Sequence, residues 1–570
     1  MVAAGPDRDE RMEVGVDDAN NRYDPALAEK KIESEESSNN GSTSPAQIEN
    51  ADGRLWLTEE QAYARARSHP NDTRPIYIIY APDDKDNPRN WGMAKKWYIT
   101  CFCSWLNVMT CLCAGGYSSG APQIVDEFHV SEEVGTVGLS LYILVSSQTI
   151  VLSTVANFHL QGFAVGPMLL APLSEYFGRN PVYRISWLGL VIFQIPVALA
   201  PNIGTIIVCR LIQGFFGSAP LTNTGGTVSD LWARNVSGGP MAIYGMSSTF
   251  GPPLALVISG YLAMNEGWRN LFWAYMGIFG GIWLLLVFTI PETRHSTLLE
   301  NKAARVRKTL AKENIAMSSL IRDAHADENR SLHTLFFVTL TRPFRFLFSE
   351  PITMGAAAYN GFIYGLVYLF NEAFPLVFGA GGHGFNTGEQ GLCFLGLCIG
   401  SIVGAILHPL QERYYLRKMR ENGGKGQPEA RLWLARGGAF LLPISLFWFA
   451  WTSYSTVPWI VPIIASGFFG LGIYIVILAI LNYVVDSYQT YSASALAGVI
   501  LIRNLVGAGF PLFATQMYNY LGLEWASSLL AFLSIIMIPI PWIWFIWGEK
   551  LRMRSPWARE HFNSDEDAPH

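Results

Sequence analysis

The feature that most limits how this chain can fold is a series of long apolar runs. A hydrocarbon core about 30 Å thick needs roughly 20 apolar residues per helical crossing, and only a helix satisfies its own backbone polar groups in lipid. Runs of this kind lie at 97–116, 135–173, 181–200, 203–223, 240–262, 270–290, 352–378, 391–409, 432–452, 459–483, 493–517 and 525–547. The sequence therefore predicts an all-α membrane protein with 12 transmembrane helices in two six-helix pseudo-repeats.

The charge distribution supports this prediction. Half of the chain is hydrophobic and 15% is charged, whereas ordinary soluble domains carry about 25% charged residues. Residues 1–90 hold 19 acidic and 11 basic residues, and the rest of the chain holds 26 and 29. An acidic polar segment thus precedes an apolar, slightly basic body, which argues against nucleic-acid binding, secretion and soluble catalysis.

Lys and Arg residues are unevenly shared among the connections between the runs. The segment 294–345 holds ten of them, whereas 117–134, 379–390, 453–458 and 518–524 hold none. Positively charged connections stay on the cytoplasmic side, so we expect a multi-pass cell-membrane protein with both termini in the cytoplasm.

Five regions follow from these boundaries. We expect the N-terminal segment to be disordered because it is rich in Asp, Glu, Asn and Ser. The regions are a disordered acidic cytoplasmic tail at 1–94, an N-terminal half at 95–293, a cytoplasmic central loop at 294–349, a C-terminal half at 350–548 and a cytoplasmic tail at 549–570.

The second run is nearly twice the length that one crossing needs. Its middle, residues 145–161, is polar and β-branched, and removing it leaves a span of 22 residues. Because Val codons begin with GT and Gln can be CAG, this segment can begin and end as an intron does. We hypothesise a retained intron or gene-model error, and the alternative is a genuine insertion.

Several charged and small residues interrupt the runs of the N-terminal half. Glu175 and Arg179 flank a turn at Gly178 and form a candidate cytoplasmic gate. Arg210 and Gln213 share a helix face with Gly214 and Gly217. An arginine within the membrane is costly unless it faces a partner or a wet cavity, so we expect Arg210 to take part in proton coupling, with a structural ion pair as the alternative.

The C-terminal half offers a second group of candidates. Tyr364, Tyr368 and Glu372 recur every four residues, which places an aromatic stripe ending in an acid on one helix face. Such a face could bind amphipathic or cationic molecules through cation–π contacts. Glu372 is the expected proton or substrate site, unless it lies at headgroup level and meets water. The expected substrate cavity comprises Asn107, Gln213, Tyr364, Tyr368, Asn482 and Arg503.

These motifs resemble the major facilitator superfamily, and within it the fungal twelve-span drug:H⁺ antiporters. The likeness rests on the loop motif around Gly178-Arg179, on Arg210-x-x-Gln213-Gly214, on Asn87–Trp91, and on the pattern from Tyr483 and Asp486 to Ala497. Gly251, Pro252 and Gly260 match the antiporter signature of helix five, but Ala255 and Leu256 replace its second Gly-Pro pair. The likeness covers roughly residues 83–560.

The resemblance implies the superfamily fold and an efflux function. We expect a proton-coupled secondary transporter that exports a toxin, secondary metabolite, drug or polyamine across the plasma membrane, working as a monomer with substrate, protons and lipid as its partners. No phosphate-binding loop, metal cluster or nucleophile–base pair is visible, so we expect no cofactor, no metal and no enzymatic activity. A facilitator or uptake symporter of the same fold and a non-transporting membrane sensor are the alternatives.

Overall fold

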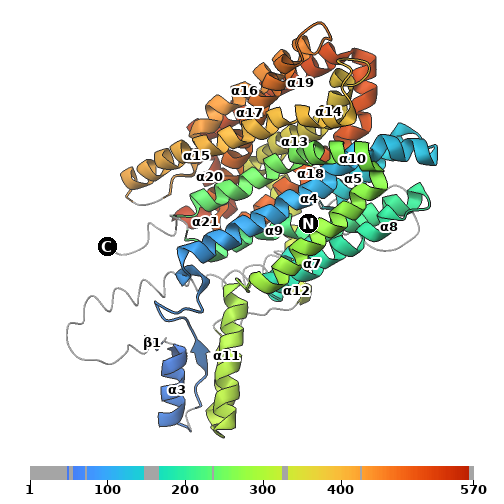
Figure 1. Ribbon diagram of the computed structural model, residues 1–570. Coiled ribbons are helices and arrows are strands. Elements are labelled where there is room, and N and C mark those ends of the chain that lie inside the picture. The colour runs from blue at the N-terminus through green and yellow to red at the C-terminus, as the bar shows by residue number, and fades with distance from the viewer. Residues whose placement is uncertain are drawn as a thin grey trace, which may run out of the picture. The chain divides into compact units, whose positions relative to one another are not determined.

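The computed structural model describes residues 48–49, 55–70, 73–146, 166–233, 236–323, 332–423 and 426–563. These residues divide into two compact units, each built from separate parts of the chain. The first unit combines the described residues up to Gly92 with Tyr176–Gly178 and Glu292–Leu335. The second unit contains the helices of both halves (Figure 1).

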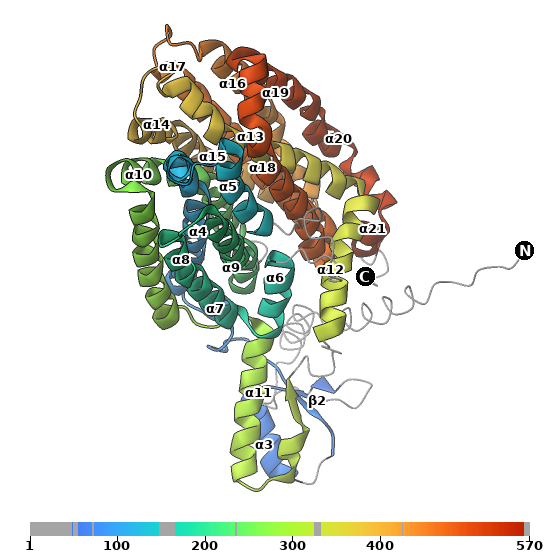
Figure 2. The same ribbon diagram turned by 90° about the vertical axis from the view of Figure 1, so that its right-hand side faces the viewer.

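The first unit contains a small sheet covered by helices. Strands β1 (Ile48–Glu49), β2 (Leu55–Leu57), β3 (Ile76–Ile78) and β4 (Ile321–Asp323) lie in that order, with β1 antiparallel to β2 and the other two pairs parallel. Helices α3 (Glu59–Ser68) and α11 (His295–Lys312) lie beside the strands (Figure 2). A shared core holds them together, formed by Leu55, Leu57, Ala62, Ala66, Ile76, Ile78, Ala303, Val306, Leu310, Met317 and Ile321.

The structure corrects the expectation that residues 1–94 are disordered, because residues 55–70 and 73–90 form this unit with the segment expected to be a central loop. Each apolar strand is three residues long, too short to stand out against the acidic composition around it. Their side chains are buried against residues far along the chain, namely those of β4 and α11. Residues 1–47 and 50–54 lie outside the described part of the chain.

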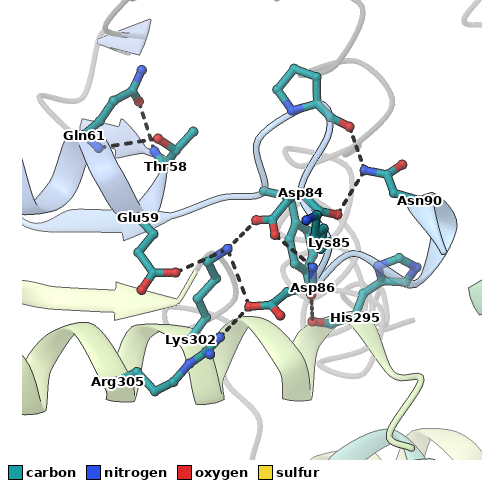
Figure 3. Close-up of polar contacts among 12 residues, drawn as sticks. Thr58, Glu59, Gln61, Asp84, Lys85, Asp86, Asn90, His295, Lys302 and Arg305 are labelled. Carbon is teal, nitrogen blue, oxygen red and sulfur yellow. Dashed lines mark hydrogen bonds and ion pairs between the residues drawn. The ribbon is translucent and has the colours of Figure 1, made fainter.

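Polar contacts also join the two sequence segments of this unit (Figure 3). The ammonium group of Lys302, on α11, pairs with Asp84 and lies 3.4 Å from Glu59 and 3.8 Å from Asp86. Arg305 pairs with Asp86 at 2.5 Å, and the Asp86 carboxylate raises the pKa of Arg305.

Around η1 (Pro88–Asn90), the Asn87–Trp91 motif forms a tight turn, in which the Asn90 amide donates to the carbonyls of Pro82 and Asp84.

In the second unit, the N-terminal half begins with α4 (Met93–Phe128) and ends with α10 (Gly238–Thr289). Between them lie α5 (Glu132–Ser146), α6 (Gly166–Tyr176), α7 (Arg179–Ile192), α8 (Gln194–Ala198) and α9 (Ile203–Leu231). The expected second crossing is represented by α5 and α6. Apart from Val145 and Ser146, the suspected insertion at 145–161 lies outside the described residues.

After α12 (Leu332–Ser349), the C-terminal half runs from α13 to α21. Its elements are α13 (Pro351–Phe378), α14 (Thr387–Cys393), α15 (Leu395–Glu421), η3 (Pro428–Leu432), α16 (Trp433–Thr452), α17 (Ile460–Tyr488), η4 (Gln489–Tyr491), α18 (Ser492–Leu521), α19 (Leu523–Met537), α20 (Pro539–Arg554) and α21 (Pro556–Asn563). Phe370, Phe374, Phe449 and Phe469 form an aromatic cluster in its core.

Ten helical segments among the described residues are long and apolar enough to cross a membrane. Helix α10 counts once among them although it has 52 residues, and Gly267 interrupts it at φ 79° and ψ 164°. Only glycine adopts this conformation without strain. Splitting α10 there gives the two crossings expected at 240–262 and 270–290. Helices α5 and α6 overlap the run 135–173, where a further crossing is expected.

The interruption in α10 is held by polar contacts. The side-chain oxygen of Gln123 accepts a hydrogen bond from the backbone N–H of Trp268 at 2.8 Å. Arg269 pairs with Glu127 of α4 at 2.5 Å and donates to the carbonyls of Ala198 and Ala200. The Gly267-Trp268-Arg269 sequence thus fixes the end of the fifth crossing against α4 and α8.

Candidate functional site

Arg210 lies at the centre of a cage of carbonyls and aromatic rings. Its side chain is completely buried on α9, and its guanidinium donates to the carbonyls of Cys113 at 2.8 Å and Ala114 at 3.2 Å. The guanidinium carbon is 4.8 Å from the ring centre of Tyr117 and 4.4 Å from that of Tyr142. Within the described residues its partners are neutral, so its charge is spread over carbonyl dipoles and ring faces rather than paired with an acid.

The other residues on the Arg210 face of α9 fix its neighbours. The Gln213 amide donates to the carbonyl of Phe193, at the break between α7 and α8, at 2.9 Å. Gly214 lies against the backbone of Tyr142, where an added Cβ would overlap the carbonyl. Helix α5 therefore approaches α9 closely enough for Tyr142 to cover the Arg210 guanidinium.

The helix-five motif makes two close helix contacts. Gly251 lies against Cys111 of α4, and Gly260 lies against the backbone of Thr387 and Gly388 of α14. Pro252 follows Gly251 within α10. Ala255, which stands in place of a motif residue, lies opposite Gly115 of α4. A small residue on each helix keeps the contact close where the second Gly-Pro pair is missing.

Arg503 is another buried arginine that pairs with no carboxylate among the described residues. It lies on α18 with 5% of its surface exposed, and its guanidinium carbon is 4.5 Å from the ring centre of Tyr364. Tyr364 meets Tyr368 edge to face at 5.2 Å. The structure thus brings together three of the six expected cavity residues.

The helix that carries Arg503 lies where the two halves meet. Helix α18 packs against α13 of its own half and against α5 of the N-terminal half. Both six-helix halves therefore contribute to the surroundings of this cation. This convergence defines the candidate substrate site.

The remaining expected cavity residues lie elsewhere. The Asn107 amide donates to the hydroxyls of Ser247 at 2.7 Å and Ser248 at 2.9 Å, while its side-chain oxygen is buried without a partner among the described residues. Gln213 belongs to the Arg210 region. Asn482 lines a different, small cavity together with His408 and Arg431.

Glu372 is half-buried on α13. The acidic group whose charge acts on it is Glu132, at the start of α5. In the described part of the chain, Glu372 makes no ion pair. The acid therefore shares α13 with the aromatic stripe, but the contact with Arg503 is made by Tyr364.

The expected gate residues have partners that the sequence did not indicate. Gly178 has φ +99°, and an added Cβ there would overlap the carboxylate of Glu292. Arg179 pairs with Asp230 of α9 at 3.2 Å and donates to the Ser174 hydroxyl at 2.7 Å. Glu175 acts on Arg179 through its charge, but the ion pair is made by Asp230.

A comparable ion-pair network in the C-terminal half was missed. Arg431 bridges Glu412 of α15 and Asp486 of α17, at 2.7 Å each. Glu412 also lies against Gly238, the first residue of α10, so the network touches the N-terminal half. The sequence signal was available, because Glu412, Arg431 and Asp486 all stand at the edges of apolar runs.

The two helical halves, with helices long and apolar enough to cross a membrane and with buried arginines among them, define an integral membrane transporter. Residues 97–511 match the model of the Major Facilitator Superfamily. The chain belongs to this family, as its motifs predicted.

Individual relatives agree with this assignment. The chain is 36% identical to the transporter paaT of Penicillium rubens over 86% of its own length and 84% of that protein. It is also 36% identical to the efflux pump MFS2 of Trichophyton rubrum, over 85% of this chain and 78% of that protein.

A solved structure shows the same fold. The proton:xylose symporter XylE matches with a TM-score of 0.53 over 80% of this chain and 97% of that chain, at 14% identity. The prediction of a helical membrane protein with the superfamily fold is confirmed, although the first unit adds a four-stranded sheet. The chain is a multi-pass membrane transporter of small compounds.

Proposed function

We propose that this transporter is a proton-coupled exporter of a small organic compound at the plasma membrane, acting as a monomer with both termini in the cytoplasm. Export is the activity named for the relative MFS2. The orientation follows from the Lys and Arg residues in the segment 294–345.

The environment of Arg210 is the observation that carries proton coupling. A guanidinium is always charged, so Arg210 cannot itself take up or release the proton. It is held by carbonyl and ring contacts that a small helix movement can break. The contacts of Arg210 therefore change when an acid elsewhere is protonated, provided that one helix lies against both Arg210 and that acid.

Helix α5 provides this connection. The carbonyl of Gly138, on α5, accepts from Arg210 at 3.4 Å, and Tyr142 of the same helix covers the guanidinium. Glu132, at the start of α5, acts on Glu372. Protonation of Glu372 removes the electrostatic repulsion between Glu372 and Glu132. The resulting shift of α5 changes the contacts that Gly138 and Tyr142 make with Arg210.

Alternating access then follows from movement of the two halves about the site around Arg503. Arg179 with Asp230, and Arg431 with Glu412, hold the helix ends together in the conformation described. We assign Glu175, Gly178 and Arg179 to the gate that opens on the cytoplasmic side.

The test is transport by the full chain in proteoliposomes with and without a pH gradient. An imposed gradient should accelerate substrate movement, and Glu372→Gln should abolish this acceleration while leaving gradient-independent exchange. Glu421→Gln, at an exposed carboxylate of α15, is the matched control. If the pH gradient does not change the rate at which the wild-type chain moves its substrate, proton coupling is wrong and the protein is a facilitator.

A further inference from the structure

Arg503 differs from Arg210 because some of its hydrogen-bond donors have no partner among the described residues. Its Nε–H donates to the side-chain oxygen of Asn504 at 3.0 Å, and the face of its guanidinium lies on Tyr364. Within the described residues, its two Nη groups have no hydrogen-bond partner and no carboxylate pairs with it. Arg210, by comparison, donates to three backbone carbonyls.

An unpaired cation buried to this extent is costly. Removing a charge from water costs several kcal/mol unless a counter-charge or further hydrogen bonds offset the loss. Charged residues within membrane spans therefore mark sites for ions or substrates. The free donors of Arg503 match a carboxylate, which an arginine binds through two parallel hydrogen bonds.

The surroundings of Arg503 also disfavour a cationic ligand. The contacts that Arg503 makes within the described residues are with neutral groups, namely the side-chain oxygen of Asn504 and the ring of Tyr364. The ring of Tyr364, which could bind a cation, is already occupied by Arg503 itself. Glu372, one helical turn beyond Tyr368 on α13, makes no ion pair with Arg503 among the described residues.

We infer that the transported compound is an organic anion, a carboxylate attached to an aromatic or other apolar body, and that Arg503 binds its charged group. The Nη donors bind the carboxylate oxygens, and the apolar body lies along Tyr364 and Tyr368. This inference rests on the proposed export function, because it names the class of substrate. It replaces the cationic class expected from the tyrosine spacing alone.

Three probes with one ring and different charges test the inference, namely benzoate, benzamide and benzylamine. Binding to the purified full chain is measured as a rise in Tm, and transport is measured in proteoliposomes. Benzoate should bind and should cross the membrane faster than it crosses protein-free vesicles, whereas benzamide and benzylamine should show neither effect. Arg503→Gln should weaken benzoate binding by at least about tenfold, because a hydrogen bond to a charged group contributes roughly 1.5–3 kcal/mol.

Two further variants separate recognition from folding. Arg503→Lys keeps the charge but loses the planar fork, and should retain part of the benzoate binding. Arg417→Gln removes an arginine that is 77% exposed on α15 and should change nothing.

The outcomes distinguish the two proposals. If benzylamine or benzamide binds and moves as well as benzoate does, or if Arg503→Gln binds benzoate normally, the anion inference is wrong although export stands. If benzoate protects the wild-type chain but not Arg503→Gln, and no probe crosses the vesicle membrane, the anion site stands and the export function is wrong.

Discussion

Arg210 and Arg503 show which features of a buried charged residue can be predicted from sequence and which cannot. Both were predicted from sequence because a cation within an apolar run has no inexpensive structural role. Their partners could not be predicted, since the carbonyls around Arg210 come from α4 and α5 and the ring on Arg503 comes from α13. Asp230 was missed as the partner of Arg179 for the same reason, because they lie 51 residues apart.

Arg210→Lys tests the cage at the residue scale. Lysine keeps the charge, but a compact ammonium cannot donate to the carbonyls of Cys113 and Ala114 while lying on the rings of Tyr117 and Tyr142. We expect gradient-driven transport to fall by more than about tenfold, measured as initial rates in proteoliposomes. Arg417→Lys is the control, and an unchanged rate in Arg210→Lys would show that charge alone suffices.

At the element scale, the sequence predicted the long helices better than the short strands. The break expected between the runs 240–262 and 270–290 lies at Gly267, where the backbone of α10 leaves the helical conformation. The strands β2, β3 and β4 were not predicted, since a run of three residues carries no clear period. Their pairing depends on partners that are distant in the sequence, which no local pattern reports.

Gly267→Ala should destabilise the helical unit. Its φ of 79° suits glycine, and a side chain in such a conformation costs about 1–3 kcal/mol. We expect a lower apparent Tm for the purified chain. Gly277→Ala is the matched control, because Gly277 lies in the same helix with open space where a Cβ would stand. Equal Tm values for the two variants would contradict the role given to Gly267.

The hypothesis on residues 145–161 is also tested at this scale. Deleting them joins Leu144 to Gly162 in a span of 22 residues, enough for one crossing. We expect the shortened chain to have a higher Tm and faster transport than the full-length chain. Sequencing of the transcripts is the independent check, and messages that all contain these codons would support a genuine insertion.

At the scale of the whole molecule, the site around Arg503 depends on both halves, and one ion-pair network touches both. Helix α18, which carries Arg503, packs against α13 of its own half and against α5 of the other half. Glu412 of the C-terminal half lies against Gly238 of the N-terminal half. The sequence predicted two pseudo-repeats, but which side chains meet between them follows only from helix packing.

Lys302→Ala tests the first unit as a separate body. The change leaves the carboxylates of Glu59, Asp84 and Asp86 without their common partner, and breaking such a buried pair is strongly destabilising. Trypsin should then cleave at Arg65 or Arg67 at least roughly tenfold faster. Lys308→Ala, at an exposed position of α11, is the control. Equal cleavage of the two variants would show that the Lys302 contacts do not hold this unit together.

The parallel pairing of β3 with β4 has a consequence for synthesis of the chain. Ile78 pairs with Asp323, so β3 leaves the ribosome about 245 residues before its partner. At 5–20 residues per second, this delay is roughly 12–50 s. For that time the edge of β3 is unpaired while an entire six-helix half is being made and inserted. The nascent chain therefore needs either a bound chaperone or its own acidic surroundings to keep Ile76 and Ile78 from pairing with another strand.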